Sequence, residues 1–201
     1  MTSHVISGSL VDRATLASPF ARSLRFASVA FGVALTAAAA QFTLPVPFTA
    51  VPFVLTPMAV LLTGAALGAR RGLLSQVAYL AAGMIGLQVF APSVVLPPGA
   101  ARLLGPTGGY LMAYPVAAFL TGWLAERGWD RRYLTSAFAM LAGLTVIHVG
   151  GVLWYTATVS HSLSLTVATN VLPFAGFDIA KILVAAAVLP QAWRLLGRHS
   201  Q

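Results

Sequence analysis

Long apolar runs separated by short polar connections dominate the pattern along this chain. Six runs stand between proline, glycine and charged breakers, at residues 24–41, 55–67, 73–90, 108–124, 133–156 and 174–196. An α-helix needs about 20 mainly apolar residues to cross roughly 30 Å of hydrocarbon, and most of these runs approach that length. The runs do not show the short alternation typical of a transmembrane barrel. The pattern therefore predicts an all-α integral membrane protein with six transmembrane helices.

The second run is too short to cross a membrane comfortably on its own. A segment at residues 43–57 comes before it, overlaps its start and holds four prolines. Proline lacks a backbone donor and breaks a regular helix. Non-helical backbone at membrane depth is tolerated only against protein or a water-filled cavity. We therefore expect this loop to line or cover a pocket.

Composition supports the same class of protein. Hydrophobic residues make up 58% of the 201 residues and charged residues only 8%, whereas an ordinary soluble domain has roughly 25% charged residues. The mean hydropathy is +0.85. The chain has no cysteine, which excludes disulfides, thiolate metal sites and a catalytic cysteine.

The formal net charge of +8 does not point to nucleic acid, because of where the basic residues lie. Ten of the twelve lie on alternate connections between the runs: Arg13, Arg22, Arg25, Arg70, Arg71, Arg127, Arg131, Arg132, Arg194 and Arg198. The positive-inside rule then places both termini in the cytoplasm. We expect residues 1–22 to form a cytoplasmic N-terminal segment, without the apolar core of a signal peptide. Residues 23–201 would form a single membrane domain in the lipid bilayer.

Two opposite charges lie inside the last apolar run. Asp178 and Lys181 are three residues apart and share one helix face, and Lys181 is the only lysine in the chain. A charge near the hydrocarbon core costs about 2.5–3.5 kcal/mol on insertion scales, so it faces a partner, a cavity or a ligand. The pair could simply neutralise itself and join two helices. We favour a binding site in which Lys181 attracts an anionic solute and Asp178 accepts hydrogen bonds from ligand N–H groups.

A second candidate site is Gly-Pro-Thr-Gly-Gly-Tyr at residues 105–110, which leads into an apolar helix. Glycines allow close backbone approach, and the amides at a helix N-terminus favour carboxylate or carbonyl oxygens. We expect Thr107, Gly108, Gly109 and Tyr110 to form part of a pocket wall. The alternative is a tight loop that only starts a helix. The Gly-Lys-Ser/Thr of a nucleotide-binding loop is missing.

Four further residues bear on the site. Asn170 precedes the last run and either caps it or reaches into the pocket, and Trp154 either belongs to an aromatic belt or stacks on a ligand. We include both as candidate binding residues. Arg102 can meet a ligand carboxylate or lie in water, and we expect water. We expect His148 to be a hydrogen-bonded core residue.

Small residues repeat on the first run, with Ala30, Ala34 and Ala38 each four apart. Such spacing lets membrane helices approach closely. The three alanines form either a packing face inside the bundle or a docking face for another membrane subunit, although alanine-rich helices also produce this spacing by chance. We treat them as candidate docking residues.

Catalytic chemistry has little support. The acidic residues Asp12, Glu126, Asp130 and Asp178 never share an apolar run, so no carboxylate dyad is expected. Neither His-Glu-x-x-His nor Gly-x-Ser-x-Gly occurs. We expect neither an enzyme nor a cofactor or metal site.

These features together resemble the BioY family of biotin transporters, the substrate-binding S components of energy-coupling factor transporters. The resemblance extends from about residue 41 to residue 189. It rests on Pro-Val-Pro at 45–47, Val-Leu-Leu-Thr-Gly at 60–64, Tyr-Leu-Ala-Ala-Gly at 79–83, Leu-Gly-Pro-Thr-Gly-Gly-Tyr-Leu at 104–111, and Pro-Phe at 173–174 with Asp178 and Lys181.

The resemblance implies a six-helix subunit of the bacterial cytoplasmic membrane that captures biotin from the outside with high affinity. Its partners would be a transmembrane coupling subunit and ATPase subunits, although some family members work without them. Lys181 would meet the carboxylate or the ureido oxygen of biotin, Asp178 a ureido N–H, and residues 107–110 the bicyclic body. The alternatives are an S component for another vitamin or small carboxylate, and a structural membrane subunit that binds nothing.

One position departs from the family pattern. Family members commonly have Val-Thr-Leu-Gln after the loop prolines, whereas this chain has Phe-Val-Leu-Thr at residues 53–56. Thr56 thus stands where a glutamine is usual. A contact of that glutamine with the ligand or the covering loop would be lost or altered.

Overall fold

The computed structural model describes residues 9–15, 20–44, 46, 49, 51–93 and 98–198. Pro45 and Pro47 of the expected pocket loop, and residues 1–8 of the N-terminal segment, lie outside the described residues. The elements of the described part are α1 (Leu10–Thr15), α2 (Ala21–Gln41), β1 (Thr43–Leu44), β2 (Phe53–Val54), α3 (Thr56–Leu67), α4 (Ala69–Met84), α5 (Ala101–Leu104), α6 (Gly108–Glu126), α7 (Tyr133–Tyr155), the π-helical turn η1 (Thr156–Ser160), α8 (Leu163–Asn170) and α9 (Leu172–Arg198).

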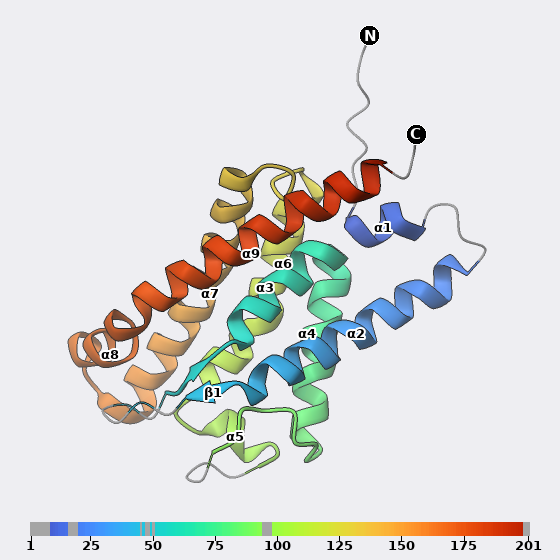
Figure 1. Ribbon diagram of the computed structural model, residues 1–201. Helices are drawn as coiled ribbons and strands as arrows, with labels where there is room; N and C mark the ends of the chain where they lie inside the picture. Colours follow the sequence, from blue (N-terminus) through green and yellow to red (C-terminus); the bar gives the residue numbers. More distant parts are fainter. Residues whose placement is uncertain are drawn as a thin grey trace.

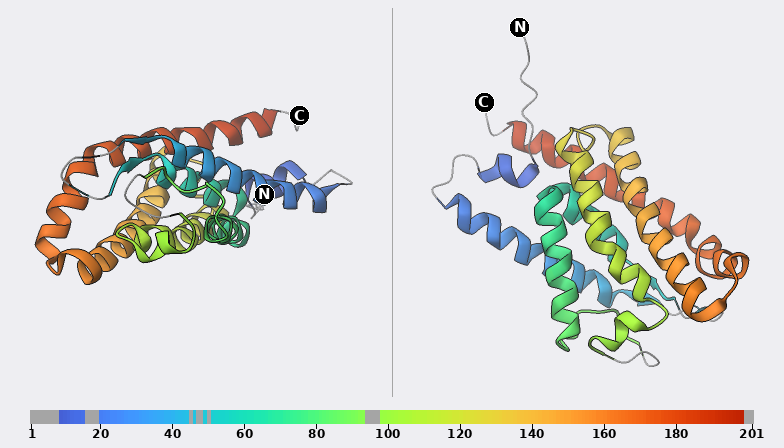
Figure 2. Two further views of the ribbon diagram at one scale, coloured as in Figure 1. Left: turned by 90° about the horizontal axis from the view of Figure 1, so that it is seen from below. Right: turned by 180° about the vertical axis from the view of Figure 1, so that it is seen from behind.

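The six longer helices of the described part form a bundle of two layers. Helices α4, α6 and α7 lie side by side in one layer, and α2, α3 and α9 lie across them (Figures 1 and 2). Helix α3 packs against both α4 and α6, and its Val60 and Leu61 are almost fully buried. Helix α1 and the C-terminal part of α9 lie at one end, the α1 end, and β1, β2, α5 and α8 lie at the other, the cavity end (Figure 1).

Each of the six apolar runs forms one long helix, and five of the six have both boundaries within three residues of the prediction. The exception is α4, which starts at Ala69 and ends at Met84 rather than spanning 73–90. Gly86 has a positive φ of 98°, which turns the chain back. Phe90 then packs edge-on against Tyr79, with ring centroids 5.5 Å apart. The apolar end of the predicted run is therefore a return over the helix and not its continuation.

Three described helices are long and apolar enough to cross a membrane, at Ser23–Gln41, Tyr133–Ser160 and Leu172–Leu195, by length and composition. Helix α3 is apolar but has only 12 residues. Large apolar side chains such as Phe31, Leu153 and Val184 are exposed on the outside of the bundle. Extended apolar surface of this kind suits contact with lipid rather than water. These features fit a multi-pass helical membrane protein.

Glycines bring α3, α4 and α6 into close contact. A Cβ atom added to Gly64 of α3 would lie 2.8 Å from the Cα of Ala118 on α6. One added to Gly72 of α4 would lie 2.8 Å from the Cα of Gly64, and Gly122 of α6 faces the backbone of Gly68 in the same way. Helices in lipid associate mainly through such close packing, because apolar side chains gain little by leaving lipid. The glycines therefore set the positions of the three central helices.

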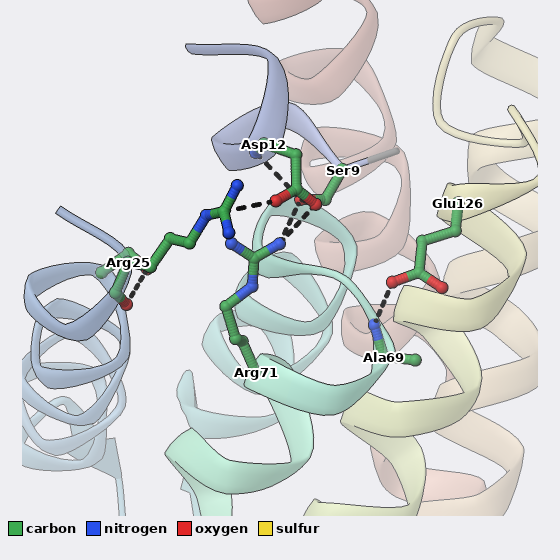
Figure 3. Close-up of polar contacts among 7 residues, drawn as sticks. Ser9, Asp12, Arg25, Ala69, Arg71 and Glu126 are labelled. Carbon is green, nitrogen blue, oxygen red and sulfur yellow. Dashed lines mark hydrogen bonds and ion pairs between the residues drawn. The ribbon is translucent and has the colours of Figure 1, made fainter. Parts of the chain in front are cut away.

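Polar contacts at the α1 end attach the N-terminal segment to the bundle. Figure 3 shows Arg25 of α2 and Arg71 of α4 both directed at the carboxylate of Asp12, with Arg25 at 3.7 Å. Burial would by itself raise the pKa of Asp12, but hydrogen bonds from Arg71 and Ser9 outweigh it and lower that pKa below its ordinary value. Glu126 of α6 accepts a hydrogen bond of 2.9 Å from the backbone N–H at the start of α4.

Replacing Gly64 by alanine is expected to destabilise the folded protein, because the added methyl group meets the backbone of Ala118, which cannot rotate aside. Overpacking costs about 1–3 kcal/mol, and we expect a cost above the roughly 1 kcal/mol that alanine gains over glycine in a helix. Thermal unfolding in detergent measures the change. The matched control is Gly176→Ala on α9, where nothing lies within 4 Å of the added Cβ. Equal stability of the two variants would contradict this account of the helix contact.

Candidate functional site

The cavity end encloses a hollow with roughly 750 Å³ of empty space, its open mouth included. Most of its wall is apolar or aromatic, and the rest is a small set of polar and charged side chains. Such a lining, mostly apolar with a few polar groups, is typical of a small-molecule site. The segment at residues 43–57 lines it through Val51, Pro52 and Val54, and through Thr56 and Pro57 at the start of α3. The expectation that this loop lines a pocket is therefore confirmed for the described residues.

Asp178 lies on the cavity wall between two basic side chains. Lys181, one turn further along α9, donates to Asp178 Oδ1 at 2.7 Å. His148 of α7 has its Nε2 3.2 Å from Asp178 Oδ2. The Asp178 side chain is only 8% exposed, and a buried carboxylate is tolerated when its oxygens are paired and hydrogen-bonded. The two helices α7 and α9 therefore meet at this carboxylate.

Lys181 also connects α9 to the β1–β2 hairpin. Its Nζ donates to the backbone oxygen of Val54 at 3.0 Å and lies 4.2 Å from the centre of the Phe53 ring. Phe53 packs edge-on against Phe177 of α9, with centroids 5.1 Å apart. The hairpin that covers the cavity is thus held by the same side chain that pairs with Asp178.

Another part of the wall is aromatic and contains a second cation. Tyr79 lies between Phe90 and Tyr114, with ring centroids 5.5 and 6.4 Å away, and all three line the cavity. Arg102 of α5 is 8% exposed and donates to the backbone oxygen of Ala91 at 2.8 Å, while its Nε has no hydrogen-bond partner among the described residues. The expectation that Arg102 lies in water is wrong, because the short helix α5 turns this side chain inward.

Two polar groups on the cavity wall have atoms without a hydrogen-bond partner in the described part of the chain. Asn170 is 1% exposed and ends α8; its Oδ1 accepts from Thr49, and its Nδ2 has no partner there. The buried hydroxyl of Tyr110 has no partner there either. Buried polar groups are normally paired, so both are suited to a ligand or water. Thr56, by contrast, forms a side-chain hydrogen bond with Tyr114.

The glycine motif at residues 105–110, which leads into α6, separates into two parts in the structure. Thr107 and Tyr110 line the cavity. Gly108 and Gly109 lie instead where α6 meets its neighbours: a Cβ on Gly109 would overlap Trp154 of α7, and one on Gly108 would overlap the backbone before α6. Trp154 donates to the backbone oxygen of Gly105 at 2.9 Å. The placement of the two glycines and Trp154 thus differs from the expected pocket wall. The small size of the glycines is used in close contacts of α6, and the indole N–H of Trp154 in a hydrogen bond to Gly105.

Several cavity residues were not singled out from the sequence as binding residues, among them His148, Arg102, Tyr79 and Tyr114. The signal for His148 was present, since a titratable side chain inside an apolar run calls for a partner or a ligand. The tyrosines had no such signal, because an aromatic residue at helical spacing is normally core. Ala30, Ala34 and Ala38 lie away from the cavity on an exposed face of α2.

The combined geometry suits a mainly apolar solute with polar groups at separate positions. Asp178 can accept from N–H groups, while Lys181, His148, Arg102 and Asn170 can donate. The aromatic wall supplies apolar contact between them. An anionic group on the solute is favoured, because basic side chains outnumber acidic ones on the cavity wall.

Known proteins resemble this chain over most of its length. The BioY family model matches residues 12–198. The probable biotin transporter BioY of Pyrococcus horikoshii is 40% identical over 169 residues, which cover 84% of this chain and 94% of that protein. The biotin transporter BioY of Thermotoga maritima is 37% identical over 147 residues, 71% of this chain and 81% of that protein. A crystal structure of the S-component for biotin from an ECF-type ABC transporter has a TM-score of 0.80 and 25% identity, covering 88% of this chain and 94% of that one.

Removing one member of the buried ion pair is expected to destabilise the protein more than removing both. Lys181→Met leaves the carboxylate of Asp178 with His148 alone, and breaking a buried pair typically costs about 3–5 kcal/mol. The double variant Asp178→Asn with Lys181→Met also removes the buried negative charge, so it should recover much of the loss. Thermal unfolding in detergent without ligand measures both. Simply additive losses would mean that the two side chains act independently, against the observed geometry.

Proposed function

The chain belongs to the BioY family, and on that premise we propose that it is the biotin-binding membrane subunit of an energy-coupling factor transporter. It captures biotin and takes part in its uptake across the cytoplasmic membrane, and it is a transport protein rather than an enzyme. The observation that carries the proposal is the cavity with Asp178, Lys181 and Arg102 on its wall, within a fold that superposes on an S-component for biotin.

The chemistry of biotin matches the separated polar groups of the cavity. Asp178 accepts a ureido N–H, and Lys181, already paired with Asp178 and with the Val54 carbonyl, donates to the ureido oxygen. The Nδ2 of Asn170 donates a hydrogen bond at the same ureido end of biotin. Arg102 has no carboxylate partner in the described part of the chain, so it takes the valerate carboxylate. Charged donors bind carboxylates more strongly than neutral ones.

The apolar body of biotin lies between these two ends. Thr107 and Tyr110 contact it from the start of α6, and Tyr79 and Tyr114 contact it from the aromatic wall. Gly108, Gly109 and Trp154 act on binding through the packing of α6 on α7. Thr56 stands at the position of the usual glutamine, and its hydrogen bond to Tyr114 makes it part of the wall.

We propose a topology of six crossings with the α1 end in the cytoplasm and the cavity open to the outside. The α1 end carries Arg25 and Arg71, which face Asp12 of α1. It also carries Arg127, which follows Glu126, the residue hydrogen-bonded to the start of α4. The positive-inside rule requires such basic residues of a cytoplasmic face. Residues 1–22 form the cytoplasmic segment, of which α1 packs against the bundle. The short helix α3 crosses the membrane together with the β1–β2 hairpin before it. The surrounding protein supports this hairpin, because non-helical backbone at membrane depth needs such support.

The partners in this proposal are a transmembrane coupling subunit and ATPase subunits, which supply the energy for release. Support comes from the similar crystal structure, which is an S-component from an ECF-type ABC transporter. The exposed surface of α2 supports the proposal as well. Only 17% of the most apolar 18-residue stretch of α2 is buried in the bundle. Ala30, Ala34 and Ala38 are all exposed. A small-residue face that the bundle leaves open suits close contact with another membrane helix.

Biotin is expected to bind the purified, detergent-solubilised protein tightly, and Arg102→Gln is expected to weaken it. A hydrogen bond to a charged group contributes about 1.5–3 kcal/mol, which corresponds to roughly 10-fold to 150-fold in affinity. Biotin methyl ester lacks the anion and should lose little affinity on the same substitution. The matched control is Arg127→Gln, whose guanidinium stacks on Trp123 at 3.3 Å, outside the cavity.

The outcomes of this experiment separate the parts of the proposal. Asp178→Asn and Lys181→Ala should abolish tight binding of biotin and of its ester alike. An unchanged biotin affinity in Arg102→Gln would place the carboxylate elsewhere in the cavity. Absence of biotin binding by folded wild-type protein would overturn the substrate, and competition with other vitamins and small carboxylates would then identify the solute.

A bulky residue on the exposed face of α2 is expected to block assembly without affecting capture. Ala34→Trp should prevent co-purification with the coupling subunit and reduce biotin uptake by cells, because it prevents close approach of helices. Biotin binding by the isolated subunit should stay at the wild-type level. Val116→Trp on α6, where the native side chain is 56% exposed, is the matched control. Normal assembly and uptake with Ala34→Trp would exclude this face as the docking surface.

A further inference from the structure

His148 lies on the cavity wall with both of its ring nitrogens facing oxygen atoms. Its Nδ1 is 3.2 Å from the backbone oxygen of Leu144, and its Nε2 is 3.2 Å from Asp178 Oδ2. A carbonyl and a carboxylate only accept hydrogen bonds, whereas a neutral imidazole carries a single N–H. Either neutral tautomer would therefore place a nitrogen lone pair against an oxygen. The imidazolium form, with two N–H donors, satisfies both contacts.

The surroundings of the ring supply one carboxylate and few other titratable groups. On α9, Asp178 faces His148 directly, and Lys181 holds the other oxygen of that carboxylate at 2.7 Å. On α6, Tyr110 lies edge-on to the imidazole with centroids 6.3 Å apart, and Tyr155 follows on α7 itself. Helices α3 and α8 contribute no titratable residue. The His148 side chain is 20% exposed and lines the cavity.

The charge of the cavity depends on this proton. With His148 protonated, Lys181 and His148 together exceed Asp178 by one positive charge, and Arg102 adds another on the same wall. An anion bound in a poorly hydrated cavity interacts strongly with such charges. It therefore favours the protonated ring, and by thermodynamic reciprocity the proton favours the anion by the same factor.

We propose that His148 is a proton-binding residue of the ligand site, which links capture of the biotin anion to uptake of one proton. The inference rests on the proposed function above and adds a second cargo to the same cavity. The proton enters with the ligand from the outer solution and leaves with it to the cytoplasm, so no other reactant is needed. Loss of the proton also removes a donor that holds Asp178 in position for the ligand N–H.

The physiological consequence is a directional bias. Binding is tighter where the solution is more acidic, and release is easier where it is more alkaline. A membrane that is acidic outside would therefore favour loading at the open cavity and unloading toward the cytoplasm.

The test is the affinity of biotin for the purified full chain between pH 5.5 and 9, a range in which the ligand carboxylate stays ionised because carboxyl groups titrate near pH 4. Wild-type affinity should fall with rising pH, by at most about tenfold per pH unit for one linked proton. Calorimetry in two buffers of different ionisation enthalpy should show uptake of up to one proton on binding.

Two substitutions assign the proton to its residue. His148→Gln keeps a neutral amide donor in the cavity and should flatten the pH profile over this range. His161→Asn is the matched control, because His161 is exposed and has a φ of 51°, a conformation that asparagine also adopts. Its pH profile should equal that of the wild type. Nitrogen-15 spectra of histidine-labelled wild-type protein need no variant: at a fixed pH, biotin should raise the doubly protonated fraction of one ring.

The failures are distinguishable. Tight biotin binding by the wild type with a flat pH profile and no proton uptake would overturn the proton linkage and leave the biotin site intact. A pH dependence that persists in His148→Gln would overturn the assignment to this residue. Absence of biotin binding at every pH would overturn the proposed function instead.

Discussion

The cavity end depends on how the carboxylate of Asp178 is neutralised inside an apolar bundle. Its two oxygens are paired with Lys181 on the same helix and with His148 on α7. Lys181 in turn bonds the backbone of the β1–β2 hairpin. Because a buried carboxylate without partners would be strongly unfavourable, these contacts hold α7, α9 and the hairpin in one arrangement. The same contacts keep Asp178 on the cavity wall, where its oxygens can accept one further hydrogen bond.

Close backbone contact at the centre of the bundle makes this arrangement possible. Gly64, Gly72 and Gly122 let α3, α4 and α6 approach with little side-chain volume between them. The start of α6 is fixed in a similar way, where Gly109 meets Trp154 of α7. The hollow lies at the other end of these packed helices, where the hairpin, α5 and α8 fold back over the helix ends (Figure 1).

Much of the molecule could be read from particular residues. The long apolar runs form the expected helices, and the motifs around Tyr110 and Asp178 predicted a family membership that is confirmed. The prediction was wrong at the end of α4, where Phe90 returns onto Tyr79, and at Arg102, which the short helix α5 turns into the cavity. Both errors concern short irregular segments, whose direction depends on contacts with residues distant in the sequence.

The class of the protein and its buried charged pair follow from the amino-acid sequence alone. Hydrophobic run length is a local property, and Asp178 and Lys181 lie one turn apart on one helix, so neither needs knowledge of the fold. Three relations become visible only in the folded protein: His148 is the second partner of Asp178, Arg102 faces the same cavity, and Gly108 and Gly109 lie in helix contacts. Those relations join different helices, and the crossing of helices in lipid is set by the packing of side chains that no local pattern specifies.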